Sequence, residues 1–134
     1  MRIPAVLAAI ISLGLIAAAP AGGAGDFAPG EKLTLTNCGR CHVVNEKNRR
    51  GGIESTPSFA IIRSWPDWED KMRAFWALRP HIVFTQIARV TPPFPHNRPS
   101  PIHPIRLTLD EVERIVEYAR TIEPADLGDK VQIR

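Results

Sequence analysis

The sequence lacks the features by which several common classes of protein are recognised. Cysteine is scarce, with 2 residues, and 17 Lys and Arg against 14 Asp and Glu leave a formal net charge of only +3. A nucleic-acid-binding chain normally clusters basic residues along one face, so this small surplus predicts no nucleic-acid partner. No nucleophile–base pair and no carboxylate pair stands out, and we therefore expect a protein that is not an enzyme in its own right.

Proline and apolar residues are plentiful, and their distribution bounds the fold. The 134 residues suit one domain and are too few for two of typical size. Apolar residues make up 44% and charged residues 23%, which is ordinary for a chain that folds around a core. Because proline restricts the backbone and cannot donate a backbone hydrogen bond, a cluster of six prolines predicts a fixed irregular loop over about 91–104: Pro92, Pro93, Pro95, Pro99, Pro101 and Pro104.

The first residues have the layout of an export signal. Arg2 precedes an apolar run over 3–19, which small residues follow. We predict a secretory signal peptide over 1–24, cleaved near residues 21–24, and a periplasmic domain over 25–134. The alternative is an uncleaved anchor, since about 17 apolar residues is at the lower limit for crossing the hydrocarbon core. A membrane is therefore expected as a partner only if this segment is retained.

The only two cysteines, Cys38 and Cys41, are separated by two residues and followed at once by His42. A disulfide between them would close a very small loop and stabilise the fold little. A redox pair of the thioredoxin type would need a βαβ pattern around the motif, and none is visible. A metal site would need two further ligands, and no second Cys or His pair has the spacing to supply them.

The remaining interpretation uses the whole motif. Two thiols three positions apart on a helical turn can add to the two vinyl groups along one edge of a haem, and the adjacent histidine then supplies the proximal nitrogen to the iron. An export signal and the lack of any other cysteine favour this interpretation. We therefore predict one covalently attached haem c, with Cys38, Cys41 and His42 as cofactor-binding residues and His42 as the proximal iron ligand.

From this motif onward the sequence resembles the class I c-type cytochromes. That family places a short helix before the motif, and residues 29–37 lead directly into Cys38 in the same way. Gly30 resembles the small residue that lets the first and last helices of the family cross closely. Pro57 matches the proline whose carbonyl bonds to the other nitrogen of the proximal histidine, and the resemblance thus implies that Pro57 belongs to the haem site. A simple turn proline is the alternative.

The last helix is similar to the C-terminal helix of the same family, including an aromatic residue at Tyr118. Thr108 and Glu111 form the sequence of a capping box, and Pro124 stops the helix, which we predict over about 108–123. One apolar stripe follows it at helical spacing: Leu109, Val112, Ile115, Val116, Ala119 and Ile122.

The middle of the chain predicts another helix over about 66–78, with Pro66 in its first turn. One broad face of this segment either packs in the core or walls the haem. It carries four aromatic residues and a methionine: Trp65, Trp68, Phe75, Trp76 and Met72. Only a short strand is expected, within 82–90. The predicted fold class is therefore mostly α. The resemblance implies a small single-domain cytochrome c-like fold, with helices and long loops wrapped around one haem.

The family pattern fails at the sixth iron ligand. Class I cytochromes normally present a Met from the loop before the last helix, but the only Met after the signal segment is Met72, on the predicted middle helix. Phe84 and Thr91 stand where two stretches that resemble the family's Met loop would carry the Met. Neither side chain is a normal ligand of haem iron.

Four side chains remain as distal candidates. His96 is the leading one, because it lies in the proline-rich loop ahead of the last helix, where the family's distal ligand is found. The alternatives are His103, His81 and Met72, and an open or water-bound position is the remaining choice. A thioether ligand raises the reduction potential, a second imidazole lowers it, and a five-coordinate iron can bind a small gas or peroxide.

The resemblance implies a periplasmic monohaem cytochrome c that carries single electrons between redox partner proteins. Basic residues near the motif could steer an acidic partner: Arg40, Lys47, Arg49 and Arg50. One alternative is a haem-based gas or redox sensor with an open or weak distal position. The other is a haem subunit of a larger periplasmic oxidoreductase.

Overall fold

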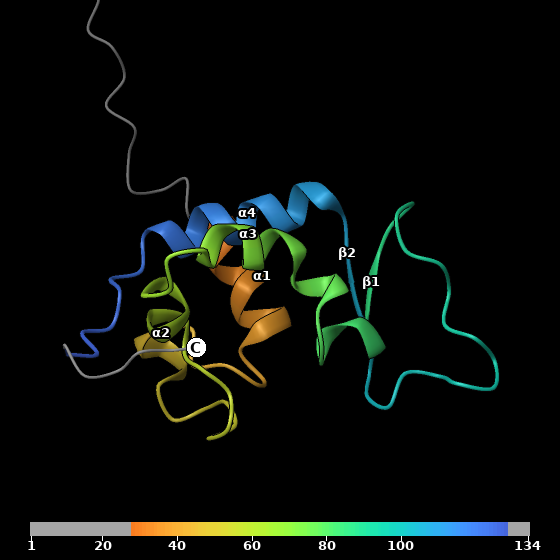
Figure 1. Ribbon diagram of the computed structural model, residues 1–134, viewed down its shortest axis with the longest axis horizontal. Coiled ribbons are helices and arrows are strands. Elements are labelled where there is room, and N and C mark those ends of the chain that lie inside the picture. The colour runs from red at the N-terminus through yellow and green to blue at the C-terminus, as the bar shows by residue number, and fades with distance from the viewer. Residues whose placement is uncertain (1–27, 129–134) are drawn as a thin grey trace, which may run out of the picture.

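The structure is a computed structural model that describes residues 28–128, and its fold is mostly helical with a small sheet (Figure 1). The predicted signal peptide over 1–24 lies outside the described residues. Within 28–128, no helix is both long and apolar enough to cross a membrane. The helices are α1 (Ala28–Cys38), α2 (Phe59–Arg63), α3 (Trp68–Ala74) and α4 (Leu109–Arg120), with short 3-10 turns η1 (Glu46–Asn48), η2 (Phe75–Ala77) and η3 (His81–Val83). The strands are β1 (Thr85–Ile87) and β2 (Ile105–Leu107).

Helices α1 and α4 pack against each other and meet at Gly30. A Cβ at this position would lie 2.9 Å from the backbone oxygen of Arg114 and 3.1 Å from the Cβ of Tyr118. Both distances are shorter than a methyl group normally accepts, so only glycine lets the two helices lie this close. The close crossing expected at Gly30 is confirmed.

Helix α4 begins with the predicted capping box. Thr108 Oγ1 accepts a hydrogen bond from the Glu111 N–H at 3.2 Å, and Glu111 Oε2 accepts one from the Thr108 N–H at 2.7 Å. The helix ends at Arg120 rather than at 123, and Thr121 is its C-cap. One face is buried. Its buried residues are Tyr118 and four members of the predicted apolar stripe: Val112, Ile115, Val116 and Ala119.

The middle helix is shorter than predicted. It begins at Trp68 rather than at 66, and after Ala74 the chain tightens into the 3-10 turn η2. Trp68 and Met72 are 9% and 8% exposed and belong to the core. The Arg63 guanidinium covers the Trp68 ring at 4.1 Å from its centre, which is a cation–π contact. Phe75, by contrast, is only partly buried and faces the pocket described below.

The two strands pair in parallel, with Thr85 opposite Ile105. The Ile105 N–H also donates to the Phe84 carbonyl at 2.8 Å, which extends the pairing toward η3. The strand expected within 82–90 is therefore present as three residues. The segment over 88–104, which holds the six clustered prolines, contains only turns and irregular backbone and projects away from the helices (Figure 1). The pairing of β1, which follows η3, with β2, which precedes α4, places these two parts of the chain side by side.

Candidate functional site

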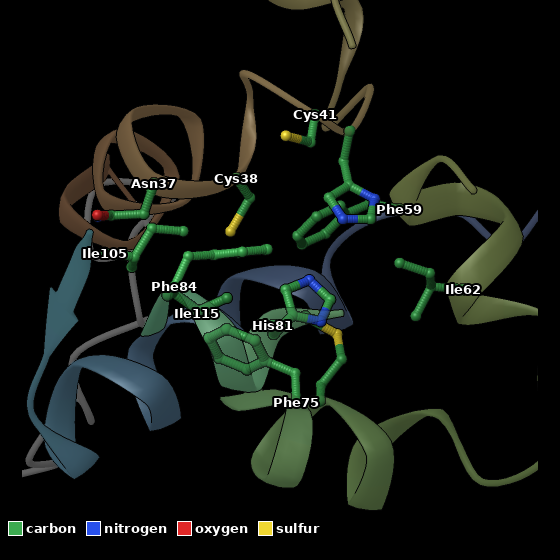
Figure 2. Close-up of a pocket in the computed structure, with 12 residues that line it drawn as sticks. Asn37, Cys38, Cys41, Phe59, Ile62, Phe75, His81, Phe84, Ile105 and Ile115 are labelled. Atoms are coloured by element: carbon green, nitrogen blue, oxygen red, sulfur yellow. The ribbon is translucent and has the colours of Figure 1, made fainter. Parts of the chain in front are cut away.

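The two cysteines lie on one closed turn at the end of α1. Both the Cys41 N–H and the His42 N–H donate to the Cys38 carbonyl, at 3.0 and 2.9 Å. Both thiols are free and half-buried. Figure 2 shows Cys38 and Cys41 together on one side of a pocket, with His81 and Phe75 on the other side.

The ring of His42 is fixed by the carbonyl of Pro57, which lies 2.7 Å from Nδ1. A carbonyl oxygen can only accept a hydrogen bond, so Nδ1 carries a proton, and in the neutral ring the lone pair is then on Nε2. This is the bond that the resemblance implied for Pro57. It sets the tautomer and orientation that a histidine needs to bind a metal through Nε2.

The loop after the motif is shaped to deliver that carbonyl. The Phe59 N–H donates to the Val43 carbonyl at 2.9 Å and holds the two segments together. Gly52 has a φ of +82°, and a Cβ there would lie 3.1 Å from the Val43 nitrogen. Glycine therefore permits the turn that carries Pro57 back to His42.

Asn48 is a supporting residue that the sequence did not single out. Its Nδ2 donates to the carbonyls of His42 and Gly39, at 2.8 and 3.2 Å. Its Oδ1 accepts from the N–H groups of Val44 and Asn45, at 2.8 and 3.1 Å. One amide thus ties the backbone on both sides of His42 into a single unit. A lone polar residue in a loop has no periodic signal from which this role could be recognised.

The pocket below the motif is a partly open hollow with a cavity volume of about 80 Å³. This volume is smaller than the about 300–1,000 Å³ that is usual for small-molecule and cofactor sites, so a cofactor would also fill the open mouth of the hollow. Apart from the motif, Asn37 and His81, its walls are apolar: Phe59, Ile62, Met72, Phe75, Phe84, Ile105 and Ile115. Such walls give whatever group the hollow holds a surface of low polarity.

Burial raises the pKa of the Cys38 thiol to about 12, with a smaller contribution from Cys41. A dithiol that performs disulfide exchange has a lowered thiol pKa, because the thiolate is the reactive form. The environment of Cys38 acts in the opposite direction. It therefore weighs against the thioredoxin-type interpretation of the motif.

His81 lies across the pocket from His42. The centres of the two imidazole rings are 6.0 Å apart and their planes are within 13° of parallel. Phe75 and Phe84 hold the His81 ring by edge contacts, with centre distances of 5.1 and 5.5 Å. Burial, and to a smaller extent the neighbouring His42, lower the pKa of His81 below its usual value, which favours the neutral ring.

The other distal candidates lie elsewhere, except for Met72. His96, the leading candidate from the sequence, is exposed in the proline-rich segment and does not line this pocket. His103 is exposed at a neighbouring hollow. Thr91 closes a turn with Ile87, whose N–H donates to Thr91 Oγ1 at 2.8 Å, and also lies outside the pocket. Met72 lines the pocket from α3.

The donor set fits a haem better than a bare metal ion. Within 28–128, no three His, Cys, Asp or Glu side chains are grouped to hold a metal ion. A haem brings its own ring of nitrogen donors and asks the chain only for axial ligands and an apolar wall.

The basic residues around the motif differ in their partners. Lys47 Nζ pairs with Glu31 at 2.7 Å, and Arg49 pairs with Glu46 at 3.6 Å. Arg40 lines the hollow beside the pocket and forms no ion pair with another described residue. Arg50 likewise forms no ion pair with a described residue, so Arg40 and Arg50 are the two of these four basic residues whose charges are not paired within the described chain.

Comparison with protein-family models, curated proteins and solved structures found no match to this chain. The function is therefore inferred from the chemistry of the pocket and its motif.

Proposed function

We propose that this chain is a periplasmic monohaem cytochrome c, with a fold like that of the class I family, and that it carries single electrons between redox proteins. One observation carries the proposal. Two free thiols on a single turn and a histidine whose Nδ1 is held by the Pro57 carbonyl line one pocket with mainly apolar walls.

Each residue of the motif has a defined task. The Cys38 and Cys41 thiols would each add S–H across a vinyl group of the haem, which forms a thioether and releases no other product. His42 Nε2 would bind the iron, and the Pro57 carbonyl would hold the opposite edge of the ring. The haem supplies a one-electron iron couple when it is bound.

The surrounding fold supports the same proposal. The close α1–α4 crossing at Gly30 keeps Cys38, at the end of α1, beside Ile115 on α4, and both residues line the pocket. Phe59 from α2 and Phe75 from η2 complete its walls. A low-dielectric environment of this kind is one of the means by which a protein tunes a haem potential.

A haem-based sensor is the second candidate, and His81 favours it. Its side chain is only partly buried, on the short turn η3, and its ring forms no hydrogen bond with the described residues. A group held in this way could be displaced by a small ligand. The remaining alternative, a haem subunit of a larger oxidoreductase, would use the same pocket. Measuring the size of the native assembly in cell extract would distinguish such a subunit from a free protein.

The proposal is tested by measuring whether the chain carries covalently attached haem. The full chain, expressed in a bacterium that matures c-type cytochromes, should appear in the periplasm with one haem that remains on the polypeptide after denaturation. Cys38→Ala combined with Cys41→Ala should lose this haem, whereas His103→Ala should retain it as a matched control. A wild-type chain that matures without covalent haem would refute the proposal.

A second measurement separates the carrier from the sensor. A carrier should give reversible one-electron voltammetry, and its reduced form should bind CO slowly or not at all. A sensor should bind CO quickly and without the need for a partner protein.

A further inference from the structure

The two imidazoles in the pocket are arranged as a pair. His42 and His81 have near-parallel planes, and their ring centres are 6.0 Å apart. Two imidazoles that bind one metal from opposite sides have a metal–nitrogen distance of about 2.0 Å each, which puts their ring centres about 6 Å apart.

The surroundings of His81 hold its ring in this position. The turn η3 is fixed by the Phe84 N–H, which donates to the His81 carbonyl at 3.0 Å. Phe75 meets the ring edge-on at 89°, and Phe84 meets it at 63°. The two phenyl rings therefore leave the imidazole little freedom to turn away from His42.

Phe84 takes the place of the Met that the resemblance would provide as a thioether ligand. It stands at the Met position in the stretch that resembles the family's Met loop. It lines the pocket and packs against His81, so it acts as a wall of the site rather than as a ligand. His81, three positions earlier in the chain, presents the nitrogen donor.

We infer that His81 is the sixth ligand of the iron, opposite His42, so that the protein is a cytochrome with two histidine ligands. The inference rests on the proposed haem. A second imidazole in place of a thioether shifts the potential downward. The carrier would therefore work at a lower potential than a relative with a Met ligand.

The experiment uses the full-length holoprotein and reads the spin state of the ferric iron by absorption and electron paramagnetic resonance. The wild type should be low-spin. His81→Ala should keep covalent haem, become high-spin, and return to low-spin when free imidazole is added. His96→Ala removes an exposed histidine outside the pocket and should remain low-spin, as should Met72→Leu.

Each other outcome has a definite meaning. A low-spin His81→Ala protein would overturn the inference, as would a high-spin wild type. Loss of the low-spin state in Met72→Leu alone would assign the position to Met72 instead. If His81→Ala does not accumulate, His81→Met decides, because a thioether should raise the potential and an unchanged potential would overturn the inference. Absence of covalent haem from the wild type would instead refute the proposed function, and the inference with it.

Discussion

Replacing Gly30 with Ala tests the packing that holds α1, and the turn of Cys38 and Cys41 at its end, against α4. Alanine is favoured over glycine within a helix by roughly 0.5–1 kcal/mol, so propensity alone would stabilise the variant. The new methyl group would lie 2.9 Å from the backbone oxygen of Arg114, which cannot rotate away as a side chain can. Overpacking of this kind costs about 1–3 kcal/mol, and the steric effect should therefore prevail.

We expect Gly30→Ala to lower the free energy of unfolding by about 1 kcal/mol, within the range of about 0–2.5 kcal/mol that the difference between these two effects spans. The transition midpoint would fall by about 4–8 °C per kcal/mol for a domain of this size. Urea denaturation of the holoprotein, followed by circular dichroism, measures the change. Lys32→Gly and Lys32→Ala provide the control, because Lys32 is exposed on the same helix and their difference isolates propensity. If Gly30→Ala stabilises as much as Ala does over Gly at Lys32, the reasoning about close packing is wrong.

Two further predictions concern charge. The Arg120 guanidinium, with help from Arg73 and against partial desolvation, lowers the pKa of Glu69 from 4.5 to about 2. A lowered pKa in the folded state stabilises the fold above the unfolded value and loses that effect as the pH falls toward 2, so Glu69→Gln should flatten the acid side of the pH–stability curve. A Glu69→Gln curve with the wild-type acid slope would contradict this. Arg40→Gln should weaken the salt dependence of electron exchange with an acidic redox protein more than Lys47→Gln does, because Glu31 already neutralises Lys47; equal effects of the two variants would argue against docking at Arg40.

Much of the local structure could be predicted because it depends on neighbours in the sequence. The capping box of Thr108 and Glu111 spans one turn, and its geometry follows from two residue types at fixed spacing. The small residue at Gly30 was expected at the helix crossing by resemblance, and the structure confirms it. The bond from His42 to the Pro57 carbonyl was likewise expected and is present.

The identity of the side chain that faces His42 across the pocket could not be predicted from the sequence in the same way. His96 was preferred because it precedes the last helix in the chain, but position along a loop does not determine which side chains turn inward. His81 faces the pocket because Phe75 and Phe84 close around it from η2 and the end of η3. That this stretch lies across the pocket from His42, with 6.0 Å between the two imidazole ring centres, is a contact between segments far apart in the chain that no local pattern connects.

The pairing of β1 with β2 has a consequence for engineering. The segment over 88–104, which holds the prolines, leaves the sheet after Ile87 and returns at Ile105, at the opposite end of the parallel pair. Lengthening such a tethered excursion costs little free energy, since closure entropy grows only slowly with loop length. Foreign peptides can therefore be introduced there without displacing the motif or the Phe75 and Phe84 rings that pack against His81. The proline-rich segment is therefore the place where another polypeptide can be inserted into this small protein.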